Sequence, residues 1–243
     1  MVRKSIRKYT SEPVSDELLN SLLQQAERTQ TMGNLQLYSV IVTRSEEMKS
    51  KLSPFHFNQP MVKQAPVVLT FCADYNRTTE WALLRKGHPG YGNLLSYQNA
   101  ATDALLFCQH FCDLAEAAGL GLCFLGTTIY QPLQIINLLK LPKLVMPVAT
   151  ITLGWPDENP APTLRLPISA IRHDEVYHAH TPESIDRDYQ ETEADPTNQS
   201  FVNLNHTETL AQIFTDIRYT VSDCDAMSET LRQALVQQGF LEE

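Results

Sequence analysis

Residues 119–126 have the sequence Gly-Leu-Gly-Leu-Cys-Phe-Leu-Gly, and they separate a long helical pattern from a short apolar strand. The helical pattern runs from about Leu95 to Ala118 and carries apolar residues on more than one face, which is typical of a helix buried on several sides. Gly119 is a natural stop for this helix. A dinucleotide-binding fingerprint would need a preceding strand and a third glycine at the position of Phe124, so the spacing excludes that fold.

Apolar segments rich in β-branched residues predict the strands of one sheet. They lie at residues 38–43, 67–73, 122–125 and 145–153. Helical patterns fall between and after them: after Ser15 as N-cap, after Pro132, and near residues 45–52, 207–218 and 227–238. Residues 77–95 predict a short helix followed by a loop. The predicted fold class is therefore α+β, a small sheet packed with helices and followed by an extended C-terminal portion.

A cluster of cations lies near the start of the chain, with the sequence Arg3-Lys4-Ser5-Ile6-Arg7-Lys8-Tyr9. Because the formal net charge of the chain is -9, this local positive charge indicates an anionic ligand rather than a nucleic-acid surface. In an extended stretch, Arg3, Ser5 and Arg7 point to the same side. Two guanidiniums and a hydroxyl suit a phosphate, since arginine forms forked, charge-assisted hydrogen bonds. The alternative is a solvated basic surface without a ligand.

The composition of the chain limits the classes of protein to which it can belong. A chain of 243 residues that is 43% hydrophobic can bury one substantial core. It contains neither a run of 18 apolar residues nor an apolar signal-peptide core, which argues against a membrane span and the secretory route. Its five cysteines lie mostly in apolar stretches, as reduced thiols do. These features predict a cytoplasmic protein that binds neither membrane nor nucleic acid.

Three further motifs follow in order: Leu139-Lys140-Leu141-Pro142, Leu153-Gly154-Trp155-Pro156 and Arg165-Leu166-Pro167. Together with Arg-x-Ser-x-Arg at residues 3–7 and the glycine-rich run, they resemble the FMN-dependent nitroreductase family. The closest subgroup is that of the oxygen-insensitive, NADPH-linked nitroreductases and flavin reductases. The resemblance extends from Arg3 to about Tyr177 and returns weakly in the C-terminal helices.

The resemblance implies an FMN site assembled from residues far apart in the sequence. The implied cofactor-binding residues are Arg3, Lys4, Ser5, Arg7, Thr31, Gln36, Gln59, Phe124, Leu125, Gly126, Thr127 and Arg165. The first four hold the phosphate and ribityl chain, and Arg165 closes on the phosphate from the other end. Thr31 and Gln36 lie against the flavin and Gln59 reaches the isoalloxazine edge. Residues 124–127 line the ring, with backbone N–H groups of Gly126 and Thr127 near N5.

The same resemblance implies the architecture and the reaction. The fold would be nitroreductase-like, with a small central mixed sheet, and the protein an intertwined homodimer. Residues 1–177 would form the FMN-binding core, and residues 178–243 an acidic linker and helical arm that passes over the partner subunit. NADH or NADPH would reduce the flavin, which would then reduce a nitroaromatic compound, a quinone or a free flavin by ping-pong hydride transfer. No side chain is assigned a catalytic role, because the flavin carries the chemistry.

Two positions depart from the family pattern. Thr163 stands where the family often has a second phosphate-binding cation. Residues 183–195 contain six acidic residues against the single base Arg187, which predicts an exposed, mobile segment. An acidic surface repels the 2′-phosphate of NADPH, so use of NADH or of both nucleotides is expected. The alternative functions are a flavin-binding or sensing protein with little turnover, and a dehydrogenase or dehalogenase with a specific substrate.

Other chemistries find weak support. His173, His178 and His180 are not joined by another ligand at a convincing spacing, so no metal site is predicted. Cys108 and Cys112 lie one helical turn apart on an apolar helix, where cysteines usually serve packing. The chain also lacks the nucleophile elbow of serine hydrolases.

Overall fold

The computed structural model describes residues 3–242. The described chain forms two compact units, one made of residues 3–161 and 227–242 and the other of residues 162–226. All the strands described lie in the first unit.

A four-stranded sheet lies at the centre of the first unit. Its strands are β1 (Tyr38–Thr43), β2 (Val67–Asp74), β3 (Gly121–Leu125) and β4 (Val145–Gly154), in the order β1-β2-β4-β3. The four predicted strands are confirmed to within one residue at each end. Every neighbouring pair is antiparallel, so the prediction of a mixed sheet is wrong. Long helical connections allow either direction, and residue patterns along a strand do not reveal that of its neighbour.

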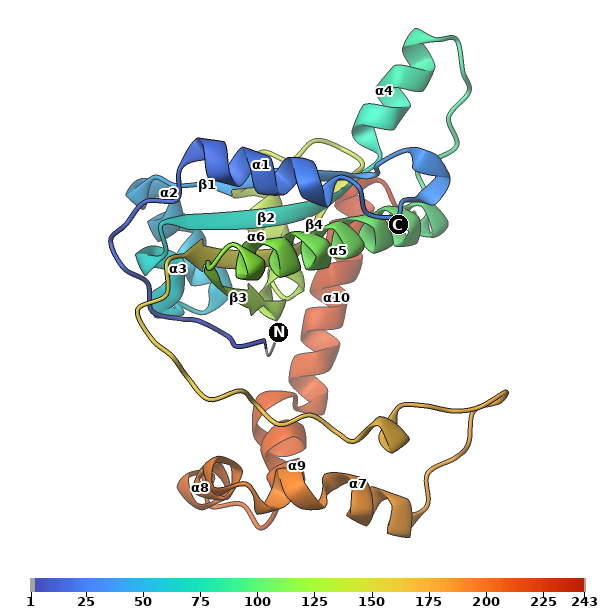
Figure 1. Ribbon diagram of the computed structural model, residues 1–243. Helices are drawn as coiled ribbons and strands as arrows, with labels where there is room; N and C mark the ends of the chain where they lie inside the picture. The colour runs from blue at the N-terminus through green and yellow to red at the C-terminus, as the bar shows by residue number, and fades with distance from the viewer. Residues whose placement is uncertain (1–2, 243) are drawn as a thin grey trace. The chain divides into compact units, whose positions relative to one another are not determined.

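One face of the sheet is covered by α5 (Leu94–Ala117), with α1 (Asp16–Ala26) beside it (Figure 1). Phe71 of β2 packs against Phe107 and Phe111 of α5, with ring centroids 5.9 and 6.0 Å apart. Phe107 also stacks on Tyr38 of β1 at 4.2 Å. The helix predicted at about residues 95–118 is thereby confirmed as the central element of the core.

Shorter elements cover the opposite face. They are α2 (Glu46–Leu52), α3 (Pro60–Gln64), α6 (Pro132–Leu139) and the 3₁₀ helices η2 (Ser53–His56) and η3 (Gly126–Ile129). Their smaller core takes Val68 from β2, while its neighbour Leu69 faces α5. Such alternation is the period of two expected for a strand with both faces buried. Leu125 of β3 belongs to this second core and therefore fixes the backbone that leads into η3.

The segment before α1 lies along the edge strand β3. The Ile6 N–H donates to the carbonyl of Leu122 at 2.9 Å. A Cβ atom on Gly121 would lie 2.8 Å from Ile6, so only glycine permits this close approach. The hydroxyl of Tyr9 bonds the side chain of Thr152 at 2.7 Å. These contacts fix residues 3–9 against the sheet.

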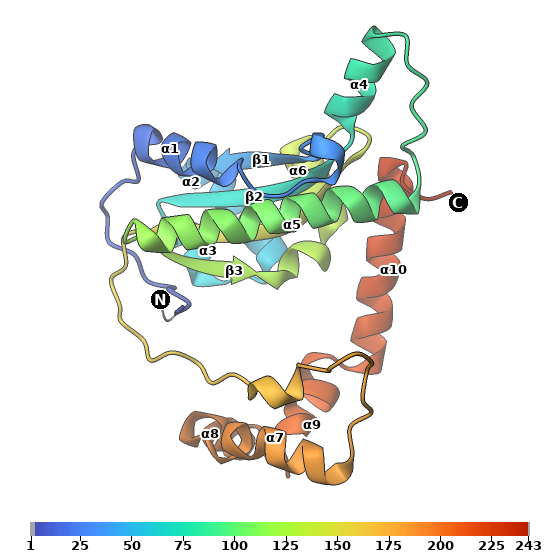
Figure 2. The same ribbon diagram turned by 45° about the vertical axis from the view of Figure 1, so that its right-hand side comes forward.

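The remaining parts of the first unit are α4 (Asn76–Leu84) and the end of α10 (Val221–Gln238). α4 projects away from the sheet (Figure 2). Its side chains Trp81 and Leu84 are exposed. The chain after α10 packs into the core through the fully buried Phe240. None of the helices described is both long and apolar enough to cross a membrane.

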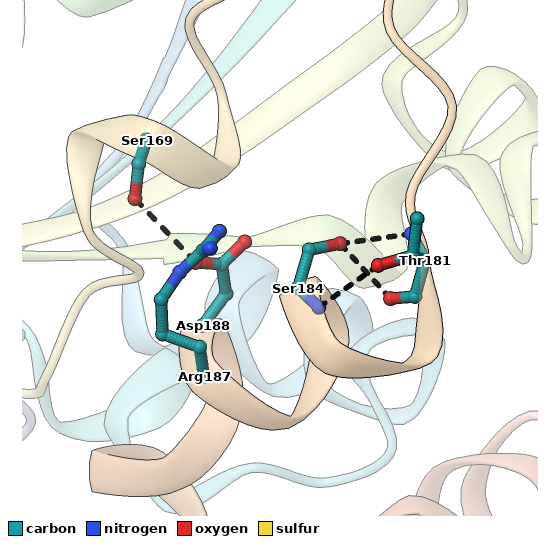
Figure 3. Close-up of polar contacts among 5 residues, drawn as sticks. All are labelled: Ser169, Thr181, Ser184, Arg187 and Asp188. Atoms are coloured by element: carbon teal, nitrogen blue, oxygen red, sulfur yellow. Dashed lines mark hydrogen bonds and ion pairs between the residues drawn. The ribbon is translucent and has the colours of Figure 1, made fainter.

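The second unit contains α7 (Pro182–Ala194), α8 (Pro196–Asn205), α9 (Leu210–Gln212) and a π-helical turn at Ile213–Arg218. The prediction of a mobile segment at residues 183–195 is wrong, because this stretch is the helix α7. Thr181 and Ser184 form a reciprocal capping box at its start (Figure 3). Asp188 is buried and accepts from Arg187 at 2.9 Å and from the Ser169 hydroxyl at 3.4 Å.

Candidate functional site

The cationic segment brings two guanidiniums to strand β3. Burial raises the pKa of the Cys123 thiol, and the nearby guanidiniums of Arg7 and Arg3 lower it. The Arg7 side chain also forms a hydrogen bond to Cys123. Ile6 is buried, whereas Arg7 and Lys8 are exposed. Arg3 also pairs with Glu116 of α5, at 3.8 Å between Nε and the carboxylate.

Two residues that the sequence did not indicate hold this segment in place. The Glu158 carboxylate accepts from the backbone N–H of Arg7 at 2.5 Å and of Lys8 at 3.1 Å. The Lys4 ammonium donates to the Asn159 side chain at 2.7 Å. Both acceptors follow β4 and are about 150 residues away in the chain.

The end of β3 and the start of η3 present an open surface. Phe124 is 45% exposed, although its neighbours in the strand are buried. No atom lies within 4 Å of the position that a Cβ atom would take on Gly126, and its φ is not in the left-handed region. Neither packing nor backbone conformation therefore requires glycine there. An approaching planar ligand is a physical reason for the missing side chain.

A buried histidine, His56, contacts the segment that forms this surface. His56 is 0% exposed, and its Nδ1 lies 2.7 Å from the hydroxyl of Thr127. The backbone N–H of Gln59 donates to the His56 carbonyl at 3.2 Å. Burial lowers the pKa of His56 to about 4, so the imidazole is neutral at pH 7. The sequence analysis did not single out His56.

The lowered pKa of His56 predicts a stability that declines in acid. Between pH 7 and pH 5 the unfolded chain binds a proton at this histidine and the folded chain does not, so folding is disfavoured as the pH falls. Wild type is expected to lose about 2 kcal/mol more stability over this range than His56→Asn, which cannot titrate. Urea unfolding at both pH values measures the difference. Equal losses in the two proteins would contradict the buried, neutral histidine.

The loop before β1 is fixed by a carboxylate from α5. Asp103 is 0% exposed and accepts from the backbone N–H of Met32 at 2.9 Å and of Leu37 at 3.2 Å. Gln36 adopts φ 48° and donates to the Asn34 side chain at 2.8 Å. These bonds give the loop one defined conformation. The two contacts of Asp103 join residues about 70 apart, which explains why sequence patterns did not indicate it.

Replacing Asp103 by asparagine is expected to destabilise the protein by about 2 kcal/mol, because one of the two buried N–H donors loses its acceptor. Thermal unfolding and limited proteolysis of residues 31–37 measure the effect. Asp113→Asn is the matched control, since Asp113 is exposed on the same helix and accepts only from Gln109 among the described residues. A similar loss in both variants would contradict the assigned role of Asp103.

The structure brings some of the predicted residues together and separates others. Arg7, Gln59 and residues 124–127 lie at the β3 side of the sheet, linked by the contacts given above. Thr31 and Gln36 precede β1, which forms the opposite edge. Three strand spacings, about 14 Å, separate these edges. A cleft of about 780 Å³ beside Gln36 includes none of residues 3–7 or 124–127 in its lining.

Arg165 belongs to the second unit and bonds its own neighbours. Its guanidinium donates to the hydroxyl of Thr163 at 2.6 Å and to the carbonyl of Leu164 at 3.0 Å. Thr163 therefore orients Arg165 in this structure, at the position where a second cation was expected.

The residues considered for other chemistries have structural partners. Among residues 3–242, no group of three or more His, Cys, Asp or Glu side chains could hold a metal ion. His173 accepts from the backbone N–H of His178 at 3.1 Å and stacks on Tyr177. Cys108 is buried, and the hydrogen bond between its thiol and Cys112, together with burial, raises the pKa of that thiol. Such a thiol is a poor nucleophile.

Comparisons with known proteins agree with this fold. An FMN reductase [NAD(P)H] of Bacillus subtilis is 35% identical over 178 residues, which are 72% of this chain and 71% of that protein. The oxygen-insensitive NADPH nitroreductase of Salmonella typhimurium is 32% identical over 174 residues, 72% of this chain and 71% of that protein.

Solved structures extend the similarity to nearly the whole chain. The crystal structure of a Bacteroides fragilis protein matches with a TM-score of 0.98 at 54% identity, covering 99% of this chain and 98% of that one. Bacillus megaterium NfrA2 matches with a TM-score of 0.85 at 34% identity, covering 100% and 96%. The model of the nitroreductase family matches residues 1–155. By this match and these identities, the chain belongs to the nitroreductase family.

Proposed function

We propose that this protein is a homodimeric, FMN-dependent NAD(P)H oxidoreductase that reduces nitroaromatic compounds, quinones or flavins. One observation carries the proposal beyond family membership. The cationic segment lies directly against the strand whose end presents an exposed aromatic side chain and an open glycine. The cations suited to a phosphate and the open surface suited to a planar ring thus lie on the same edge of the sheet.

The residues present at this edge fit FMN. Arg7 is exposed beside β3 and can pair with a dianionic phosphate. The open space at Gly126 admits a flat ring, and Phe124 offers an apolar surface next to it. We therefore assign the phosphate to residues 3–7 and the ring to residues 124–127.

Bound FMN supplies the hydride chemistry, accepting two electrons from NAD(P)H and passing them to an acceptor. The chain supplies binding and orientation. Arg3 and Arg7 offset the charge of the phosphate, and Glu158 keeps the backbone of Arg7 in place. The N–H groups of Gly126 and Thr127 are the donors that we assign to the ring edge. One open face serves reductant and acceptor in turn, which is why we propose a ping-pong sequence.

The separation of the predicted residues supports the proposed homodimer. Thr31 and Gln36 lie at the β1 edge, so they can contact the flavin at β3 only if they come from a second copy. Exposed apolar side chains on α4 and α5 suit such an interface: Trp81, Leu83, Leu84, Leu94, Leu95, Leu105 and Leu106. We also propose that the helical part of residues 178–243 contacts the partner subunit, and that Arg165 reaches the phosphate in the assembled protein.

The choice of nucleotide rests on the charge of the second unit. Arg187 is the only base in residues 183–195, and its guanidinium is paired with the buried carboxylate of Asp188 at 2.9 Å. No unpaired cation in that stretch is left to attract the 2′-phosphate of NADPH. We propose that the enzyme uses NADH at least as well as NADPH, and that it acts in the cytoplasm.

Steady-state kinetics test this proposal. Initial rates are measured with NADH or NADPH against a nitroaromatic compound, a quinone and free FMN. Parallel double-reciprocal lines, with kcat/KM for NADPH no higher than that for NADH, are expected. Bound FMN without turnover of any acceptor would favour the alternative function of a flavin-binding or sensing protein.

A further inference from the structure

His56 joins two segments that we assign to the flavin. It lies at the end of η2 and is completely buried. Its carbonyl accepts from the N–H of Gln59 at 3.2 Å, and its Nδ1 lies 2.7 Å from the hydroxyl of Thr127. His56 therefore links residue 59, through its backbone carbonyl, to the segment at residues 124–127, through its buried side chain.

Hydrogen-bond requirements fix the direction of the bond to Thr127. Nε2 of His56 is buried and has no partner among residues 3–242. A neutral imidazole carries one proton, on Nδ1 or on Nε2. Protonation of Nε2 would bury an N–H donor without an acceptor, which is less favourable than burying an unpaired lone pair. The proton is therefore on Nδ1, and His56 donates to the Thr127 oxygen.

This direction determines what Thr127 can offer a ligand. A threonine hydroxyl has one proton to donate. Because its oxygen accepts from His56, that proton remains for another partner. The bond to His56 is the only hydrogen bond of this hydroxyl among the residues described. Thr127 is half-buried and directly follows the exposed Gly126.

We propose that His56 is a positioning residue that holds the Thr127 hydroxyl as a hydrogen-bond donor to the edge of the bound flavin. The inference rests on the proposed function, since it needs the flavin at residues 124–127. His56 itself does not contact the cofactor. Its neutral form is maintained at pH 7 by burial, which keeps the donor in place throughout the physiological range.

Substitutions at both positions test the coupling. His56→Leu removes the donor, and His56→Asn retains an N–H near the position of Nδ1. Thr127→Val removes the hydroxyl, and Thr127→Ser retains it. The measurements are the Kd for FMN, from titration of the apoprotein, and the position of the visible band of the bound flavin.

His56→Leu and Thr127→Val are each expected to raise the Kd about tenfold and to shift the flavin band equally, as loss of one hydrogen bond would. The double variant should match either single variant. His56→Asn and Thr127→Ser should remain within about threefold of wild type. If His56→Leu does not fold, His56→Gln takes its place, because its amide lies near Nε2 instead of Nδ1.

Ser53→Ala is the matched control. Ser53 lies in the same 3₁₀ helix, is completely buried and has an unpaired hydroxyl in the part of the chain described. It should leave the Kd and the band unchanged. Additive effects in the double variant, or wild-type FMN binding in His56→Leu, would overturn the inference. Wild-type protein that does not bind FMN would instead refute the proposed function.

Discussion

Replacing both Arg3 and Arg7 by alanine is expected to raise the Kd for FMN at least about 100-fold while the fold is retained. Each guanidinium can form charge-assisted hydrogen bonds to the phosphate, worth about 1.5–3 kcal/mol apiece. The segment itself is held by backbone contacts of Ile6 to Leu122 and of Arg7 to Glu158, which the substitutions preserve. Loss of the partly exposed pair between Arg3 and Glu116 removes little stability.

Lys8→Ala is the control for this experiment. Lys8 is exposed in the same segment, and its backbone N–H, not its side chain, bonds Glu158. The substitution removes one charge without changing the assigned phosphate ligands, so the Kd should change less than about threefold. Titration of the apoprotein with FMN and circular dichroism of each variant provide the readouts. Undiminished FMN binding in the double variant would refute the assigned phosphate site.

Gly126→Leu is expected to abolish FMN binding without lowering the Tm. The side chain would occupy open space, since no atom of the protein lies within 4 Å of the added Cβ. The backbone there tolerates any residue, because φ is not in the left-handed region. The only group that the leucine would displace is the ligand. Differential scanning calorimetry and FMN titration separate stability from binding.

Gly121→Ala is the comparison variant, because it is expected to lower the Tm, whereas Gly126→Leu is not. Its Cβ would lie 2.8 Å from Ile6, so the N-terminal segment must move. Overpacking of this kind destabilises a protein by about 1–3 kcal/mol. The Tm is expected to fall, and FMN binding to weaken with the displaced cations. Normal FMN binding by the Gly126→Leu variant would contradict the assignment of the flavin ring to residues 124–127.

Local patterns predicted the elements of the fold well. The apolar, β-branched segments at residues 38–43 and 145–153 each formed a strand at the predicted place. The stop at Gly119 ended α5 as expected, with φ +87°. The relative direction of neighbouring strands and the burial of individual charged residues could not be predicted from these local patterns. The antiparallel order depends on how distant strands meet. The helix α7 begins at the capping box of Thr181 and Ser184 and buries one acid, Asp188, within a mostly exposed acidic run.

The site was predictable where a motif is local and not where it is assembled by the fold. Residues 3–7 and 124–127 were indicated by short motifs. Glu158, Asp103 and His56 were not, because each acts on a segment about 70 to 150 residues away in the chain. Their partners are backbone N–H groups and one hydroxyl, which leave no pattern in the sequence.

The visible spectrum of the purified protein, followed by anaerobic addition of NADH or NADPH, tests the central claim most directly. The account predicts a flavin band, retained after incubation with FMN and gel filtration, that bleaches with either nucleotide. Absence of a flavin band even after incubation with FMN would contradict the assignment of residues 3–7 and 124–127 as an FMN site.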